Sequence, residues 1–165
     1  MMIKPIPQCY WVVPGKLIAG EYPRNQSLQT SPEKMNKILG VGVTSFIDLT
    51  EYAELSSYEA YLKTAMHYQF PIKDLSIPES PELTMKILDL IDALISDGEV
   101  VYLHCWGGIG RTGLIVGCWL SRHGGRGDDV LKQLEMLWVN CSKYPDRESP
   151  ETIEQVQYIL DWDGQ

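Results

Sequence analysis

The stretch from Val100 to Gly113 constrains the fold of this chain more than any other. Residues 100–104 are almost wholly apolar, which predicts an interior strand of a sheet whose two faces are both covered by other elements. A glycine-rich loop follows, and Arg111 then stands where a helix is expected to begin. A strand, a loop and a helix in this order point backbone N–H groups into one concavity, and the helix end adds positive potential. The stretch therefore predicts an α/β fold with an anion-binding loop at the end of a central strand.

Strands and helices alternate along the rest of the chain. Apolar runs on either side of a Pro-Gly turn predict two edge strands, and the later runs predict interior strands. The tripeptide Ser-Pro-Glu predicts a helix start at each of three places, because it combines a capping hydroxyl, a proline suited to the first helical position and an acid. The predicted strands are Trp11–Val13, Lys16–Ala19, Val43–Leu49, Met66–Ile72 and Val100–His104, and the tripeptides begin at Ser31, Ser80 and Ser149.

The spacing of apolar residues places helices at about 81–95, 111–122, 128–139 and 150–162. Alternating strands and helices are typical of a parallel sheet with helices on both faces. We therefore expect one α/β domain over residues 1–165, with a central, mostly parallel sheet of about four to five strands flanked by about six helices.

Composition narrows the class of protein and of partner. Fourteen Lys and Arg against twenty-two Asp and Glu give a net charge of −8, which repels polyanions, so we expect no nucleic-acid partner. The four cysteines and three histidines lack the spacing of a metal site, so we expect no metal and no cofactor. Neither a membrane-length apolar run nor a signal-peptide core is present, so we expect a cytoplasmic monomer with no membrane partner.

Two side chains of the glycine-rich loop suggest its chemistry. The N–H groups and the helix end should favour the thiolate form of Cys105 and make it a nucleophile. Arg111 offers a planar fork that matches two oxygens of a phosphate group. A purely structural turn with a buried cysteine would not explain a cation at a helix N-terminus, where an anion is needed to offset it.

The motif His104-Cys105-x5-Arg111-Thr112-Gly113 resembles the phosphate-binding loop of the cysteine-dependent protein tyrosine phosphatase superfamily. The size and the flanking sequence most resemble its compact, atypical dual-specificity branch. The likeness extends to residues 11–22 (the opening hairpin), 45–51 (an interior strand), 70–78 (the general-acid loop) and 151–155 (the last helix).

The resemblance implies a role for each residue of the loop. Cys105 would attack phosphorus and form a phosphocysteine, and the Thr112 hydroxyl would bond its sulfur. Arg111 and the backbone N–H groups would hold the phosphate oxygens in the transition state. The residues expected to bind phosphate in this way are Trp106, Gly107, Gly108, Ile109, Gly110 and Arg111.

A leaving alkoxide or phenoxide needs a proton, so a carboxylic acid must reach the same pocket. Asp74 follows a strand-like run and lies 31 residues before Cys105, a separation typical of the family it resembles. Asp48 is the alternative acid.

The substrate class follows less directly from the sequence. The loop interior, Trp-Gly-Gly-Ile-Gly, carries no charge, which disfavours a polyphosphorylated headgroup. We expect a phosphoprotein phosphatase that acts on phosphotyrosine, phosphoserine or phosphothreonine. The alternatives are the same chemistry on a small phosphomonoester, an inositol phosphate or an RNA 5′-triphosphate, or an inactive module that binds phosphoproteins. The presence of Cys105, Arg111 and Asp74 together favours an enzyme, since a binding module needs neither the thiol nor the acid.

Overall fold

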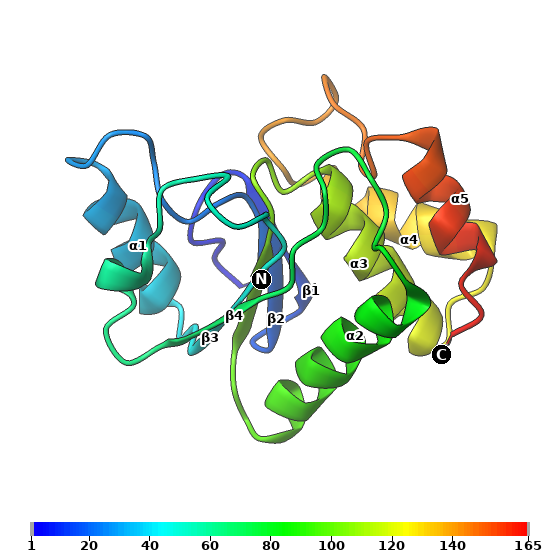
Figure 1. Cartoon of the computed structure of the whole chain (residues 1–165), viewed down its shortest axis with the longest axis horizontal. Helices are drawn as coiled ribbons and strands as arrows, with labels where there is room; N and C mark the ends of the chain where they lie inside the picture. Colours follow the sequence, from blue (N-terminus) through cyan, green and yellow to red (C-terminus); the bar gives the residue numbers. More distant parts are fainter. Residues whose placement is uncertain (1, 165) are drawn as a thin grey trace.

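The computed structural model describes residues 2–164 and consists of a five-stranded sheet with helices on both faces (Figure 1). The strands are β1 (Cys9–Val13), β2 (Leu17–Gly20), β3 (Ser45–Asp48), β4 (Met66–Gln69) and β5 (Val101–His104). Their order in the sheet is β1-β2-β5-β3-β4, with β1 antiparallel to β2 and the other neighbours parallel. The predicted α/β class and the mostly parallel sheet are confirmed.

The helices lie on the two sides of this sheet. α1 (Ser31–Gly40) lies on one side, and α2 (Pro81–Ser96), α3 (Gly110–Arg122), α4 (Asp128–Trp138) and α5 (Ile153–Asp161) lie on the other (Figure 1). A short 3₁₀ helix, η1 (Glu59–Tyr61), precedes β4. Residues 2–164 thus form five α-helices and one 3₁₀ helix, slightly fewer α-helices than predicted. None of these helices has the length and apolar character needed to cross a membrane.

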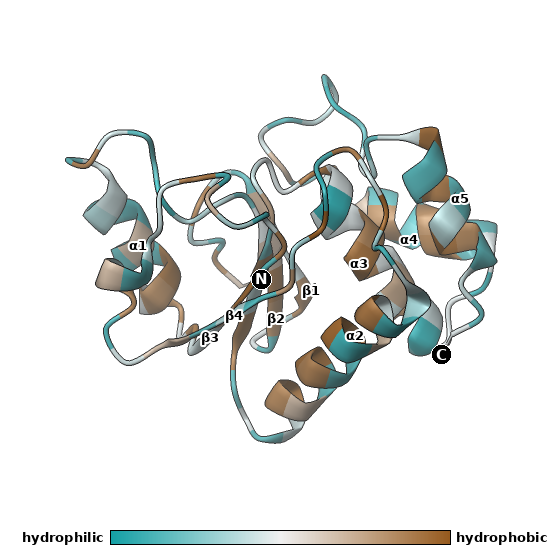
Figure 2. Ribbon diagram, viewed as in Figure 1, coloured by the Kyte–Doolittle hydropathy of each residue, from teal (hydrophilic) through white to brown (hydrophobic). Residues whose placement is uncertain are grey.

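The hydrophobic core lies on both sides of β5, which is buried along its whole length. Val101 and Leu103 belong to the cluster under α2–α5, whereas Tyr102 belongs to the cluster under α1, because successive side chains of a strand point to opposite faces. Almost every residue of α3 is buried, and the helix packs against α2, α4 and α5. Figure 2 shows hydrophobic residues along the strands and on α2. The strand and the helix that flank the glycine-rich loop are therefore both fixed in the core.

The parallel register brings the carboxyl ends of four strands to one edge of the sheet. His104 lies opposite Gly20 on one side and Asp48 on the other, and Asp48 lies opposite Gln69. The loops that follow β2, β3, β4 and β5 therefore leave the sheet together. Ligands of open α/β sheets bind outside this edge.

Two strands occupy positions in the sheet that differ from the prediction. β2 pairs with both β1 and β5 and is fully buried, so it is an interior strand and not an edge strand. β4 lies at the margin beside β3 and is only partly buried, so it is an edge strand and not an interior one. Strand order depends on which distant segments pair, and the pattern of a single strand does not reveal that.

Two of the three Ser-Pro-Glu tripeptides begin a helix. The Ser80 hydroxyl caps α2 by accepting from the N–H of Leu83 at 3.2 Å, as predicted. α1 also starts at its tripeptide, but Ser31 lies within the helix, and its hydroxyl contacts the carbonyls of Asn25 and Ser27.

The third tripeptide does not begin a helix, so that prediction is wrong. α5 starts at Ile153, and its cap is Thr152, whose hydroxyl accepts from the N–H of Gln155 at 3.1 Å. The hydroxyl of Ser149 donates to the carbonyl of Ile109 at 2.7 Å instead. The hydroxyl is therefore used by a tertiary contact with the glycine-rich loop, which sequence periodicity does not report.

The glycine-rich loop rests directly on the end of β2. Gly108 has φ +68°, and a Cβ at this position would lie 2.4 Å from the carbonyl carbon of Gly20. The N–H of Tyr22 donates to the carbonyl of Trp106 at 2.8 Å. Residue 108 must therefore be glycine for both its backbone conformation and its contact with β2.

We predict that Gly108→Ala lowers the free energy of unfolding more than Gly42→Ala does. Both positions have positive φ, which costs a side chain about 1–2 kcal/mol. Only at Gly108 would the new Cβ meet backbone, and that overpacking should add about 1–3 kcal/mol. Urea unfolding of the two variants measures the difference, and equal losses would contradict the close contact with β2.

Candidate active site

A cavity of about 410 Å³ opens at the carboxyl edge of the sheet. Its lining includes Cys105 and Arg111, which were predicted from one motif, and Asp74, which was predicted from a separate segment. Of the other predicted residues, Gly108 faces β2, Thr112 is fully buried, and neither lines the cavity. The remaining lining residues are Trp106, Gly107, Ile109 and Gly110 at the glycine-rich loop, Leu75 next to Asp74, and Glu21, Lys143, Arg147 and Glu151 on the walls.

The guanidinium of Arg111 is buried and held by two carboxylates. Its Nη1 and Nη2 donate to the two carboxylate oxygens of Glu54, each at 2.8 Å. Nη1 also donates to the carbonyl of Ile72 at 3.0 Å, and Nη2 lies 3.1 Å from Oδ1 of Asp74. Burial disfavours the charge, but the hydrogen bonds to Glu54 and the nearby negative groups hold the pKa of Arg111 above its usual range. The fork predicted to meet phosphate is thus engaged by protein groups in this structure.

Glu54 is a site residue that the sequence analysis missed. It lies between β3 and η1, and its side chain is 15% exposed. Burial alone would raise the pKa of its carboxyl, but the hydrogen bonds from Arg111 hold that pKa below its usual value. A buried arginine requires a carboxylate partner. The segment also holds Glu51 and Glu59, however, and nothing in their spacing favours one of the three.

Two buried polar atoms at the start of α3 have no hydrogen-bond partner among the described residues. They are Nε of Arg111 and the hydroxyl oxygen of Thr112. Polar atoms left unpaired in a protein interior cost free energy, so they are expected to have a partner in the functional state. The predicted bond from Thr112 to the Cys105 sulfur is not formed here.

Asp74 sits in a tight turn between β4 and α2. Its Oδ1 accepts from the N–H of Leu75 at 3.0 Å, and the N–H of Ser76 donates to the carbonyl of Lys73 at 3.1 Å. Leu75 has φ +60°, which is uncommon for a bulky side chain. The carboxyl is half exposed and lies at the cavity beside Arg111.

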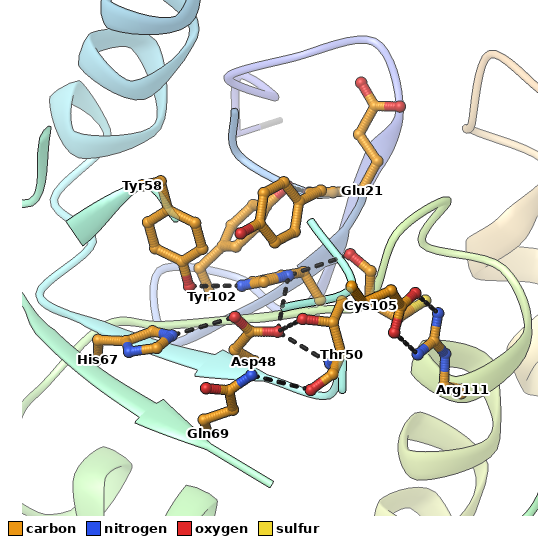
Figure 3. Close-up of polar contacts among 12 residues, drawn as sticks. Glu21, Asp48, Thr50, Tyr58, His67, Gln69, Tyr102, Cys105 and Arg111 are labelled. Atoms are coloured by element: carbon orange, nitrogen blue, oxygen red, sulfur yellow. Dashed lines mark hydrogen bonds and ion pairs between the residues drawn. The ribbon is translucent and has the colours of Figure 1, made fainter. Parts of the chain in front are cut away.

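Asp48, the alternative acid, lies outside the cavity. It is 3% exposed, and its Oδ1 accepts from the N–H and the hydroxyl of Thr50 at 2.9 and 2.6 Å. Its Oδ2 lies 3.1 Å from Nε2 of His67 (Figure 3). Because Thr50 and His67 hold its oxygens and it does not line the cavity, Asp48 is not placed to protonate a group bound beside Cys105.

A hydrogen-bonded histidine supports Cys105 from the other face of the sheet. Nδ1 of His104 lies 3.1 Å from the carbonyl of Cys105, which can only accept, so Nδ1 carries a proton. The ring is fully buried, and burial holds its pKa below the usual value. Nε2 is then unprotonated and accepts from the Tyr58 hydroxyl at 2.6 Å (Figure 3). His104 thus contacts the backbone at the start of the glycine-rich loop and is itself held by Tyr58.

The titration of His67 and Asp48 is shifted in opposite directions. The hydrogen bond to Asp48 raises the pKa of His67, and burial only partly opposes it. Burial alone would raise the pKa of Asp48, but the His104 ring, His67 and Thr50 together hold it below its usual value. The contact between the two side chains thus favours the charged form of each.

The walls of the cavity pair each cation with an acid. Lys143 donates to the carbonyl of Gly107 at 3.0 Å and lies 3.5 Å from Oε2 of Glu21. Arg147 forms an ion pair with Glu151. Residues 2–164 contain no group of three or more His, Cys, Asp or Glu side chains that could hold a metal ion.

The sequence of this region matches a known protein family. Residues 21–125, which include Asp74, Cys105 and Arg111, match the family described as "Polymorphic toxin system, DSP-PTPase phosphatase". The chain belongs to this phosphatase family. The match covers more than half of its length and agrees with the predicted resemblance to compact dual-specificity phosphatases.

Curated relatives of this DSP-PTPase chain carry related names. It is 33% identical over 117 residues to the 067L protein of Invertebrate iridescent virus 3, whose name describes it as a candidate tyrosine phosphatase. The match covers 69% of this chain and 46% of the viral protein, so the chain spans less than half of that relative. It is 29% identical over 123 residues to the dual specificity protein phosphatase CDC14AB of Danio rerio, covering 68% of this chain and 19% of that protein.

Solved structures share the fold of this DSP-PTPase chain. Tk-PTP in its active form superposes with a TM-score of 0.77 at 21% identity, covering 95% of this chain and 97% of that one. Kinase associated phosphatase superposes with a TM-score of 0.73 at 16% identity, covering 92% and 90%. At these identities the likeness shows the fold alone.

We predict that the stability of the phosphatase falls as pH rises above about 6.5, the usual pKa of histidine. The pKa of His67 is raised on folding. Its contribution to the free energy of unfolding is therefore complete below its pKa in the unfolded chain and is lost as pH rises through its pKa in the folded protein. His104 acts in the opposite direction, because its pKa is lowered on folding and its contribution is lost as pH falls below about 6.5.

Urea unfolding of the wild type and of His67→Gln between pH 5 and 9 separates the two effects. The glutamine amide can still donate to Asp48 but does not titrate, so the variant should lose only the decline above about 6.5. Parallel profiles for the two proteins would contradict this account.

Proposed function

We propose that this phosphatase hydrolyses phosphomonoesters of proteins through a phosphocysteine intermediate on Cys105. The observation that carries the proposal is that Cys105, Arg111 and Asp74 line one cavity although they come from two separate loops and a helix. They supply the nucleophile, the charge stabilisation and the acid that this reaction needs.

In the first step the Cys105 thiolate attacks phosphorus, an S–P bond forms, and the bond from phosphorus to the leaving oxygen breaks. Asp74 gives its proton to that oxygen. The backbone N–H groups of residues 106–111 and the guanidinium of Arg111 hold the other three oxygens. The Nε–H of Arg111 has no partner among the described residues and can donate to one oxygen, and Nη2 can exchange Asp74 for a second. Glu54 keeps the guanidinium in this orientation throughout.

In the second step water attacks the phosphocysteine. The Asp74 carboxylate accepts a proton from the water, the S–P bond breaks, and inorganic phosphate leaves. The departing thiolate of Cys105 needs a hydrogen-bond donor. The Thr112 hydroxyl is buried, has no partner among the described residues and follows Arg111 directly, which supports this role for it.

The rim of the cavity supports a phosphoprotein substrate over a polyphosphorylated small molecule. Arg147 forms an ion pair with Glu151, and Lys143 is engaged by the Gly107 carbonyl and by Glu21, which it shares with Lys34, so neither cation is unpaired and available for a second phosphate. Trp106 is 52% exposed and Leu75 is 53% exposed, and these two apolar side chains can contact the residues around a phosphorylated side chain.

We predict that Cys105→Ser abolishes turnover of p-nitrophenyl phosphate but still binds inorganic phosphate, because a serine hydroxyl has no comparable anionic form. Wild-type hydrolysis should continue in excess chelator and be inhibited competitively by vanadate. Cys118→Ser is the matched control, because Cys118 is buried in α3 away from the cavity lining, and it should retain turnover. Loss of all wild-type activity on chelation would contradict the proposal. Phosphopeptide binding without turnover of any substrate would favour the inactive binding module.

We predict that Asp74→Asn slows substrates according to their leaving group. For phenyl phosphate, kcat/KM should fall by about 10²–10⁴-fold, the usual contribution of general acid catalysis. A difluoromethylumbelliferyl ester should be affected little, because its acidic phenol leaves without a proton. Asp48→Asn should not show this gradation. If Asp74→Asn slows all leaving groups equally, Asp74 is not the general acid.

A further inference from the structure

Gln155 joins three segments around the cavity. It lies in the first turn of α5, and its side chain is fully buried. Its Oε1 accepts from the backbone N–H groups of Glu151 at 3.0 Å and Thr152 at 3.2 Å, and its Nε2 donates to the carbonyl of Ser76 at 3.0 Å. These partners fix the orientation of the amide, because a backbone N–H can only donate and a carbonyl can only accept.

The same amide lies against the first residue of α3. A Cβ on Gly110 would lie 2.9 Å from Oε1 and 3.0 Å from Nε2 of Gln155. Four residues before α5, the Ser149 hydroxyl donates to the carbonyl of Ile109. Residues 149–155 are therefore attached to the loop that carries Cys105 and, through Gln155, to the loop between β4 and α2. That second loop passes the N-terminal end of α3 in Figure 1.

The turn around Asp74 depends on contacts from outside it. Leu75 has a positive φ, and such strain persists only where neighbouring groups fix the backbone. The side chains of Asp74 and Leu75 are half exposed, so their burial does not provide this support.

Two buried side chains donate hydrogen bonds to backbone carbonyl groups on either side of Asp74. Arg111 donates to the carbonyl of Ile72, two residues before it. Gln155 donates to the carbonyl of Ser76, two residues after it. The carboxyl that faces the cavity is thus held between two fixed carbonyl groups.

Helix capping alone does not explain a glutamine at position 155. Thr152 and Gln155 form a capping box, a motif in which glutamate serves as well as glutamine. A glutamate would also interact favourably with the positive end of α5. It could not donate to the Ser76 carbonyl when ionised, whereas the amide does.

We infer that Gln155 is a positioning residue for the general acid, because its hydrogen bond to the Ser76 carbonyl holds the turn that aims the Asp74 carboxyl into the cavity. The inference rests on the proposed function, in which Asp74 protonates the leaving group. Asp74 remains the catalytic residue, and Gln155 acts through it.

The test compares kcat/KM over a series of aryl phosphates in Gln155→Glu and Gln155→Met. The glutamate keeps the capping box but loses the donor, and the methionine keeps the size of the side chain and loses every hydrogen bond. Thr152→Ala is the matched control, because it breaks the capping box without touching the Ser76 carbonyl. Thermal unfolding of each variant, and inhibition by inorganic phosphate, report whether the fold and the loop of Cys105 are intact.

Both Gln155 variants should lower kcat/KM for phenyl phosphate by about ten- to a hundredfold, the scale expected when a reacting group is misplaced by about 1 Å. The difluoromethylumbelliferyl ester and inhibition by phosphate should change little. Thr152→Ala should lower thermal stability without this gradation. In an Asp74→Asn background, Gln155→Glu should cost less than about twofold more, because the two residues act on the same proton transfer.

The kinetics distinguish a failure of the inference about Gln155 from a failure of the proposed function. If Asp74→Asn is graded by leaving group and the Gln155 variants are not, Gln155 is a helix cap only and the inference is wrong. The same conclusion follows if Thr152→Ala reproduces the kinetics of the Gln155 variants. If Asp74→Asn itself shows no gradation, the assignment of the acid in the proposed function is wrong, and the inference falls with it. If Gln155→Glu does not fold, Gln155→Met decides between these outcomes.

Discussion

The buried cation of Arg111 holds the candidate active site together. Removing a charge from water costs several kcal/mol, and that cost is offset only by well-placed partners. Here the partners come from two other loops: Glu54 follows β3, whereas Ile72 and Asp74 follow β4. One guanidinium therefore orders the chain segments that surround Cys105. Its Nε–H takes no part in these contacts and has no hydrogen-bond partner among residues 2–164.

The sheet and α3 give this cation a fixed position. β5 and α3 are buried in the core, so both ends of the loop between them are held by packing. The parallel register then brings the loops after β2, β3 and β4 to the same edge. Residues 149–155 connect two of these loops, because they hydrogen-bond to both the loop of Cys105 and the turn of Asp74.

Sequence reasoning succeeded where the signal was local. The Cys105–Thr112 motif predicted a loop and a helix, and Ser80 predicted the start of α2. Asp74, which lies at the cavity with Cys105, was selected by the family resemblance and not by a local signal. Sequence reasoning failed where a residue is used by a distant partner. Ser149 bonds the carbonyl of Ile109 instead of capping a helix, and Glu54 looks like any acid in a polar loop until a buried arginine is found opposite it.

The sequence by itself determined the α/β class, the glycine-rich loop between a strand and a helix, and the family, because these depend on residues close together in the chain. The tertiary structure alone decided that Asp48 lies outside the cavity, that Glu54 holds Arg111 and that Gln155 supports the turn of Asp74. Each of these contacts joins segments more than fifteen residues apart. Their physical basis is the need of buried polar groups for partners, which the chain satisfies only once the sheet has brought those segments together.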